Sequence, residues 1–191
     1  VKMESEPAAT IMLLLLVLID VIYYGFVSAL DQLNEKEIAE KAEEQGDRKS
    51  KRLYQIMNFS AIYVNTFHLM VTMVHILIGW LYMDKWVGMV EKGLVHLVTD
   101  VLHWNIALPI ISVIAVILTF ALVLYILLTF GVLLPRKLVL GKPKRWAYAL
   151  VDFIYIISRI LAPFTGLIYW TTKGVLTLFG LNGIKDEADV T

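Results

Sequence analysis

The chain has 191 residues, of which 59% are hydrophobic and 18% are charged. Soluble domains carry roughly 25% charged residues, so this apolar excess is too large for one core of this size and excludes a water-soluble globule. Seventeen lysines and arginines balance seventeen aspartates and glutamates, which argues against a nucleic-acid partner, and the absence of cysteine excludes thiolate metal sites. The composition predicts an all-α integral membrane protein whose first partner is the lipid bilayer.

Three long segments with few or no charges are expected to be transmembrane helices, at about 8–30, 57–83 and 106–133. A bilayer core of about 30 Å needs about 20 helical residues, so each segment can cross once and none can cross twice. A cleaved signal peptide is the alternative interpretation of the first segment, because small residues at 27–29 follow an apolar stretch. Its acidic start and Asp20 within the apolar run favour a retained span.

The connector 34–56 is rich in charges and helix formers and is expected to form a helical hairpin outside the lipid. Asn34 followed three residues later by Glu37 is typical of a helix start, and Gly46 is a plausible end before a second short helix from 47 to about 57.

The segment 144–180 is apolar enough to insert but contains Asp152, Arg159 and the helix-breaking run that starts at Pro163. A fourth crossing would bury both charges at a cost of several kcal/mol unless they were paired. We therefore expect two interfacial amphipathic helices here, at about 144–161 and 164–180, along the cytoplasmic leaflet.

Lysine and arginine counts predict the orientation in the cell membrane. The connector 34–53 carries six and the stretch after the third span carries five, whereas 84–101 carries two and the N-terminus one. We expect a multi-pass protein with its N-terminus outside and its C-terminus in the cytoplasm.

Enzyme signatures are absent from the sequence: there is no Gly-rich phosphate loop, no His-Glu-x-x-His and no Gly-x-Ser-x-Gly. We expect that the protein is not an enzyme and that it has neither catalytic nor cofactor-binding residues. His68 and His75 share one face of the second span, where polar packing between helices is favoured over metal binding. The alternative hypothesis is an intramembrane enzyme, and its only candidate pair of catalytic residues in the sequence is His68 with Asp20.

Asp20 is a carboxylate well inside an apolar span, which by default marks an ion or proton site. Asn65 in the second span and the Gly131 carbonyl in the third could join it. Carboxylate, amide and carbonyl oxygens are the hard ligands that Mg²⁺ and Na⁺ accept. The alternative is that Asp20 holds helices together through hydrogen bonds.

Four segments resemble, in order and spacing, the transmembrane domain of the cyclin-M/CorC magnesium transporter family. They are the acidic-then-basic run 42–53, the Asn65-Thr66 pair that looks like a Gly-Asn-Thr segment, the stretch 131–138 that looks like Gly-Glu-x-x-Pro-Lys-x-Leu, and Lys142-Pro143. The resemblance implies three spans, a homodimer and a dehydrated Mg²⁺ held between helices at mid-membrane. Asn65 and the Gly131 carbonyl match the family's pattern, and Asp20 adds a new carboxylate on the helical face that lost one at Val27. The resemblance also implies efflux with Na⁺ as counter-ion and cytosolic CBS-type regulatory domains, so that 1–182 would be the transmembrane domain and 183–191 a polar tail that begins a linker.

The expected ion-site pattern is altered in this chain. The family's span-one signature Ser-x-x-x-Ser-x-Ser-Glu aligns with Asp20, Tyr24, Phe26 and Val27, and the Glu after Gly131 is Val132. In one interpretation Asp20 compensates for these losses and the site still holds a cation. In the other the site has decayed, and the domain is a dimeric membrane scaffold or moves another substrate.

Overall fold

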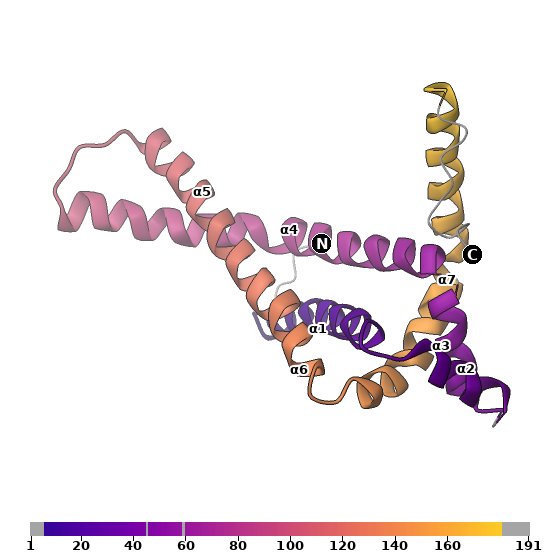
Figure 1. The fold of residues 1–191 in the computed structure, drawn as a ribbon. Helices are drawn as coiled ribbons and strands as arrows, with labels where there is room; N and C mark the ends of the chain where they lie inside the picture. The colour runs from indigo at the N-terminus through magenta and orange to yellow at the C-terminus, as the bar shows by residue number, and fades with distance from the viewer. Residues whose placement is uncertain (1–5, 45, 59, 181–191) are drawn as a thin grey trace. The chain divides into compact units, whose positions relative to one another are not determined.

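A computed structural model describes residues 6–44, 46–58 and 60–180, and its elements in this part of the chain are all helices. This confirms the predicted all-α class. The elements follow one another along the ribbon of Figure 1. They are α1 (Glu6–Leu30), α2 (Glu35–Glu43), α3 (Arg48–Asn58), α4 (Ser60–His96), the π-helix η1 (Leu97–Val101), α5 (Leu108–Ile126), the π-helix η2 (Leu127–Leu133), α6 (Leu134–Val139) and α7 (Pro143–Leu178). The predicted polar tail 183–191 lies outside the described residues.

Four helical stretches are long and apolar enough to cross a membrane: Pro7–Leu30, Tyr63–Val101, Leu108–Val139 and Pro143–Leu178. Their length and composition support a membrane protein, and the number that cross stays a prediction. The second stretch continues well past the expected end at residue 83, because α4 runs to His96 and passes directly into η1.

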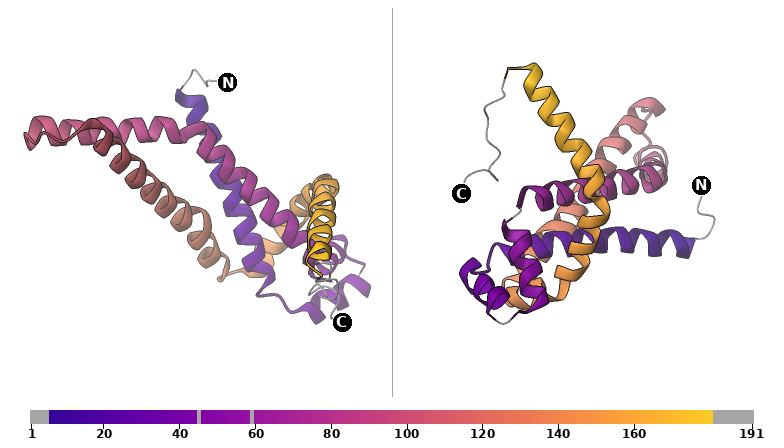
Figure 2. Two further views of the ribbon diagram at one scale, coloured as in Figure 1. Left: turned by 90° about the horizontal axis from the view of Figure 1, so that it is seen from above. Right: turned by 90° about the vertical axis from the view of Figure 1, so that its right-hand side faces the viewer.

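The break expected at Pro163 is wrong, because α7 is one helix with this proline inside it. Figure 2 shows α7 running without interruption from orange to yellow. A proline removes one hydrogen bond of the helix, and in apolar surroundings side-chain hydroxyls commonly supply further bonds nearby. Here the Thr165 hydroxyl donates to the carbonyls of Ala162 at 3.1 Å and Leu161 at 3.4 Å, so the turn around the proline keeps extra hydrogen bonds.

The contacts divide the chain into two units, Val1–Val21 with Met73–Leu134 and Ile22–Thr72 with Pro135–Thr191. In the first unit, Leu16 of α1 packs with Val74, Ile78 and Tyr82 of α4 in a buried apolar cluster. The Tyr82 hydroxyl donates to the carbonyl of Ala9 at 2.7 Å, which joins α4 to the first turn of α1.

In the second unit, α2 and α3 form the predicted hairpin. Asn34 is the N-cap of α2 and accepts a hydrogen bond from the Lys36 amide at 3.0 Å, which confirms the predicted helix start. Gly46 adopts a positive φ of 66° between the two helices, a conformation that glycine reaches at little cost. Asp47 precedes α3 and accepts bonds from the Ser50 amide and hydroxyl.

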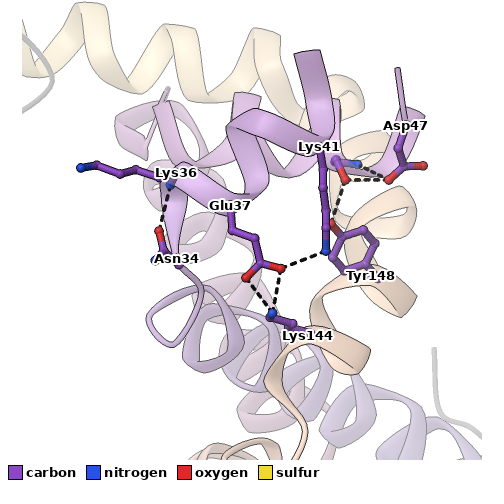
Figure 3. A network of polar contacts seen from close by, with 8 residues as sticks. Asn34, Lys36, Glu37, Lys41, Asp47, Lys144 and Tyr148 are labelled. Atoms are coloured by element: carbon purple, nitrogen blue, oxygen red, sulfur yellow. Dashed lines mark hydrogen bonds and ion pairs between the residues drawn. The ribbon is translucent and has the colours of Figure 1, made fainter. Parts of the chain in front are cut away.

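Polar contacts attach the hairpin to the first half of α7. Figure 3 shows Glu37 between Lys41 and Lys144, with the Lys144 ammonium 2.8 and 2.7 Å from its two oxygens. Tyr148 of α7 bonds the Ser50 hydroxyl at 2.7 Å, and its carbonyl accepts from the Lys49 ammonium at 2.8 Å. Hydrogen bonds from Lys144 and then Lys41 lower the pKa of Glu37 from 4.5 to about 2.

We predict that the stability contributed by Glu37 depends on pH. Its folded pKa lies below its ordinary value, so the contribution is complete above about pH 5 and is lost as the pH falls toward 2. Glu37→Gln should therefore lower the melting temperature at pH 7, and the difference should shrink as the pH falls through the folded pKa of about 2. Glu40→Gln, an exposed change on the same helix, is the control. A pH-independent effect of Glu37→Gln would contradict the ion-pair assignment.

Candidate functional site

The candidate site is centred on Asp20, whose side chain is 0% exposed. Its Oδ2 atom lies 2.9 Å from Nε2 of His75 on α4, and the two share a hydrogen bond. Its Oδ1 atom is buried and has no hydrogen-bond partner among the described residues. A buried carboxylate oxygen without a partner is costly in an apolar environment, so this atom has the capacity to bind a cation or a proton.

The helical spacing explains why Asp20 faces α4. Asp20 follows Leu16 by four residues, so both lie on one face of α1. Leu16 packs against Val74 and Ile78, and His75 follows Val74 directly. The apolar contacts between α1 and α4 therefore bring the carboxylate and the imidazole together, and the His75 side chain remains 38% exposed.

Gly131 is the other predicted ligand that the structure brings to this site. It is buried in η2, and a Cβ built on it would lie 3.5 Å from Oδ2 of Asp20. The backbone therefore approaches the carboxylate without an intervening side chain. Single π-helical turns are rare and are found frequently at functional sites.

Of the three predicted ligands, the structure brings Asp20 and Gly131 together within the first unit. Asn65 belongs to the second unit, on α4 and half-buried. The role of Asn65 stays a prediction from the sequence.

His75 is a partner of Asp20 that was not predicted from the sequence. The spacing pairs His75 with His68, but the structure places His68 exposed in the second unit, with its ring 5.3 Å from that of Phe67. The buried positions Val71, Val74, Ile78 and Tyr82 mark the inner face of α4. Because His75 follows Val71 by four residues, this apolar pattern was the signal that could have assigned it to the same side of the helix.

The positions at which the sequence predicts an altered ion site are buried or aromatic. Phe26 is 2% exposed and Val132 is 9% exposed. Tyr24 contacts the Phe67 ring edge-on at 5.1 Å, and the Arg136 guanidinium lies 5.4 Å from the Tyr24 centroid. Of these residues only Val132 belongs to the first unit, and it adds no polar atom beside Asp20 and His75.

Among the described residues, no group of three or more His, Cys, Asp or Glu side chains could hold a metal ion. A cation at Asp20 would therefore have to complete its shell with backbone carbonyls and water.

The chain matches a family model over most of its length. The model described as the cyclin M transmembrane N-terminal domain matches residues 11–191, a range that includes Asp20, His75 and Gly131. Neither the curated proteins nor the solved structures contain a significant match to the chain.

We predict that the space beside Gly131 limits side-chain size. Gly131→Ala places its methyl group at ordinary contact distance from Asp20 and should leave the melting temperature within a few degrees. Gly131→Leu forces atoms into the carboxylate and should cost roughly 1–3 kcal/mol, as overpacked cores do. Gly79→Leu is the matched control, because a Cβ on Gly79 meets nothing within 4 Å. Equal melting temperatures for the two leucine variants would contradict the close approach of η2 to Asp20.

Proposed function

The chain belongs to the family of cyclin M transmembrane N-terminal domains, and we propose that it is the membrane domain of a transporter that binds Mg²⁺ at Asp20. The family is generally linked to divalent cation transport. We assign the cation to the Asp20 carboxylate and the Gly131 carbonyl, with efflux and Na⁺ as counter-ion as the transport mode. Catalysis is not part of the proposal.

The observation that supports this function is the buried Oδ1 atom of Asp20. It has no hydrogen-bond partner among the described residues, whereas Oδ2 of the same carboxylate is hydrogen-bonded to His75. An ionised carboxylate costs several kcal/mol inside a membrane unless a counter-charge or hydrogen bonds offset the loss of water. A divalent cation at Oδ1 would supply that counter-charge.

One observation favours a second function. The His75 imidazole already bonds Asp20, and a protonated imidazole would neutralise the carboxylate without a cation. In that case Asp20 and His75 would hold α1 and α4 together, and the domain would act as a membrane scaffold or move another substrate.

We propose that three of the four apolar stretches cross the membrane and that α7 lies at the cytoplasmic surface. The first half of α7 packs against α3, a hydrophilic helix. Asp152 of α7 is paired with Arg52 of α3, and the Lys49 ammonium lies 4.0 Å from the same carboxylate. Contacts with such a charged helix suit a position at the headgroups better than one in hydrocarbon.

Two kinds of protein partner are proposed, a second copy of the chain and cytosolic regulatory domains. We propose a homodimer, because α5 leaves large apolar side chains such as Phe120 and Tyr125 more than half exposed. Mass measurement in detergent that finds only single protomers would contradict it. Regulation by cytosolic CBS-type domains follows from the family resemblance.

Magnesium binding predicts ligand-dependent stabilisation. A native-state ligand at a hundred times its Kd stabilises a protein by about 2.7 kcal/mol, so millimolar Mg²⁺ should raise the melting temperature of the detergent-solubilised chain. Asp20→Asn should abolish this rise, and Asp84→Asn, an exposed change on α4, should retain it. A rise that survives Asp20→Asn would place the cation elsewhere, and no rise in the unmodified chain would support the scaffold function.

The proposed topology predicts the labelling of single-cysteine variants, which the cysteine-free chain makes simple. Lys92→Cys should react with a membrane-impermeant maleimide on intact cells. Lys51→Cys and Lys173→Cys should react only after lysis. If Lys173→Cys reacts on intact cells as Lys92→Cys does, α7 crosses the membrane and the three-span proposal is wrong.

A further inference from the structure

We propose that the turn between α6 and α7 binds the headgroups of anionic phospholipids. Residues 136–145, the basic turn, carry five basic side chains: Arg136, Lys137, Lys142, Lys144 and Arg145. The sequence has no acidic residue between Asp100 and Asp152. The basic turn belongs to the second unit and Asp20 to the first, so the inference goes beyond the proposed cation site and does not depend on it.

Apolar contacts hold one side of the basic turn. Val139 of α6 is fully buried, and a Cβ built on Gly25 of α1 would lie 3.5 Å from its side chain and 3.8 Å from the Trp146 ring. Ala147 and Val151, four residues apart, are buried at the start of α7. With these positions turned inward, the basic side chains of the turn are left exposed.

The exposed side of the basic turn combines charge with apolar side chains. Leu138 and Leu140 are 57% and 56% exposed, and they lie in the sequence between Lys137 and Lys142. Exposed apolar side chains that basic residues surround are typical of a surface that contacts a membrane. Leucine side chains there enter the boundary of the acyl chains, while the charged groups stay among the headgroups.

Most of the basic side chains of the turn lack a counter-charge in the protein. Lys144 is paired with Glu37, and the Arg136 guanidinium lies 5.4 Å from the centroid of the Tyr24 ring. The other three have no ion pair within the described part of the chain: Lys137, Lys142 and Arg145. The phosphate and carboxylate groups of anionic lipids would supply the missing negative charge. Each basic residue at an anionic membrane surface strengthens binding by about fivefold.

The exposed basic residues of the hairpin differ in their surroundings. Arg48 and Lys51 are exposed on α3, but the acidic residue Asp47 precedes them directly. Within the described residues of α2 and α3, no large apolar side chain is exposed. This surface suits contact with water, so Arg48 and Lys51 serve as the matched control.

The place of the basic turn in the chain brings it to the lipid. It follows the apolar stretch Leu108–Val139 and precedes Pro143–Leu178. Because the first of these stretches is proposed to cross the membrane, the turn lies at a membrane surface whether α7 crosses or lies along it. In the proposed orientation this surface is the cytoplasmic leaflet, where anionic lipids are concentrated.

The test uses the full chain reconstituted in vesicles, with a fluorophore attached to the single cysteine of Gly141→Cys. Gly141 is exposed within the basic turn, and a Cβ built on it meets nothing within 4 Å. Phosphatidylserine and phosphatidylcholine, each with a nitroxide on the acyl chain, are compared as quenchers at equal fractions. We expect quenching that corresponds to a local enrichment of phosphatidylserine of at least about tenfold. A fluorophore on Gln55→Cys, at an exposed position of α3, should show no preference.

Charge variants identify the residues that bind the lipid. Lys137→Gln, Lys142→Gln and Arg145→Gln together should abolish the preference for phosphatidylserine, whereas arginine at both lysine positions should retain it. Arg48→Gln with Lys51→Gln should also retain it. All these side chains are exposed, so we expect unchanged melting temperatures, which are measured alongside.

Three results would overturn the inference: equal quenching by the two lipids, a preference that survives the triple glutamine variant, or its loss in the α3 variant. Soluble glycerol phosphate distinguishes a lipid surface from a site for free phosphate. If it removes the preference at the concentration of the lipid phosphate, the ligand is a free anion and the inference is wrong. The vesicles carry the same lipids in both leaflets, so an error in the proposed orientation, or failure of Mg²⁺ to bind at Asp20, leaves the expected result unchanged.

Discussion

The free-energy cost of removing water from the buried Asp20 carboxylate is the main constraint on the site in the first unit. Asp20 is fully buried on an apolar helix, and burying a charge in such surroundings is tolerated only when it is paired, hydrogen-bonded or neutralised. His75 satisfies one oxygen and leaves the other without a partner. The apolar cluster around Leu16 and the close approach of Gly131 enclose this carboxylate, of which only one oxygen is hydrogen-bonded.

In the second unit, in contrast, carboxylates are paired with basic side chains of the same chain. Glu37 contacts two ammonium groups, and Asp152 is paired with Arg52, so these carboxylates have their counter-charges within the chain. Their pairing joins the hairpin to α7 and needs no external ion. The contrast explains why, of the acidic residues with described surroundings, Asp20 is the one that we connect with transport.

The sequence predicted what depends on composition and local spacing. The apolar excess indicated an all-helical membrane protein, and Asn34 with Glu37 marked the start of α2, because capping is a local interaction. It did not predict the path through Pro163, because a proline removes only one hydrogen bond of the helix, and the hydroxyl of Thr165 adds bonds to the carbonyls of Leu161 and Ala162 in the same stretch. It also missed His75, because pairing across helices depends on the rotation of α4 about its axis.

The account is tested most directly by locating a cation. Mn²⁺ accepts the oxygen ligands that Mg²⁺ accepts, and its anomalous scattering identifies it in crystals of the detergent-solubilised chain. The account predicts an anomalous peak within about 2.2 Å of an oxygen of Asp20, in line with ordinary bond lengths to such ions. A map with no peak there, and with His75 still hydrogen-bonded to the carboxylate, would contradict it.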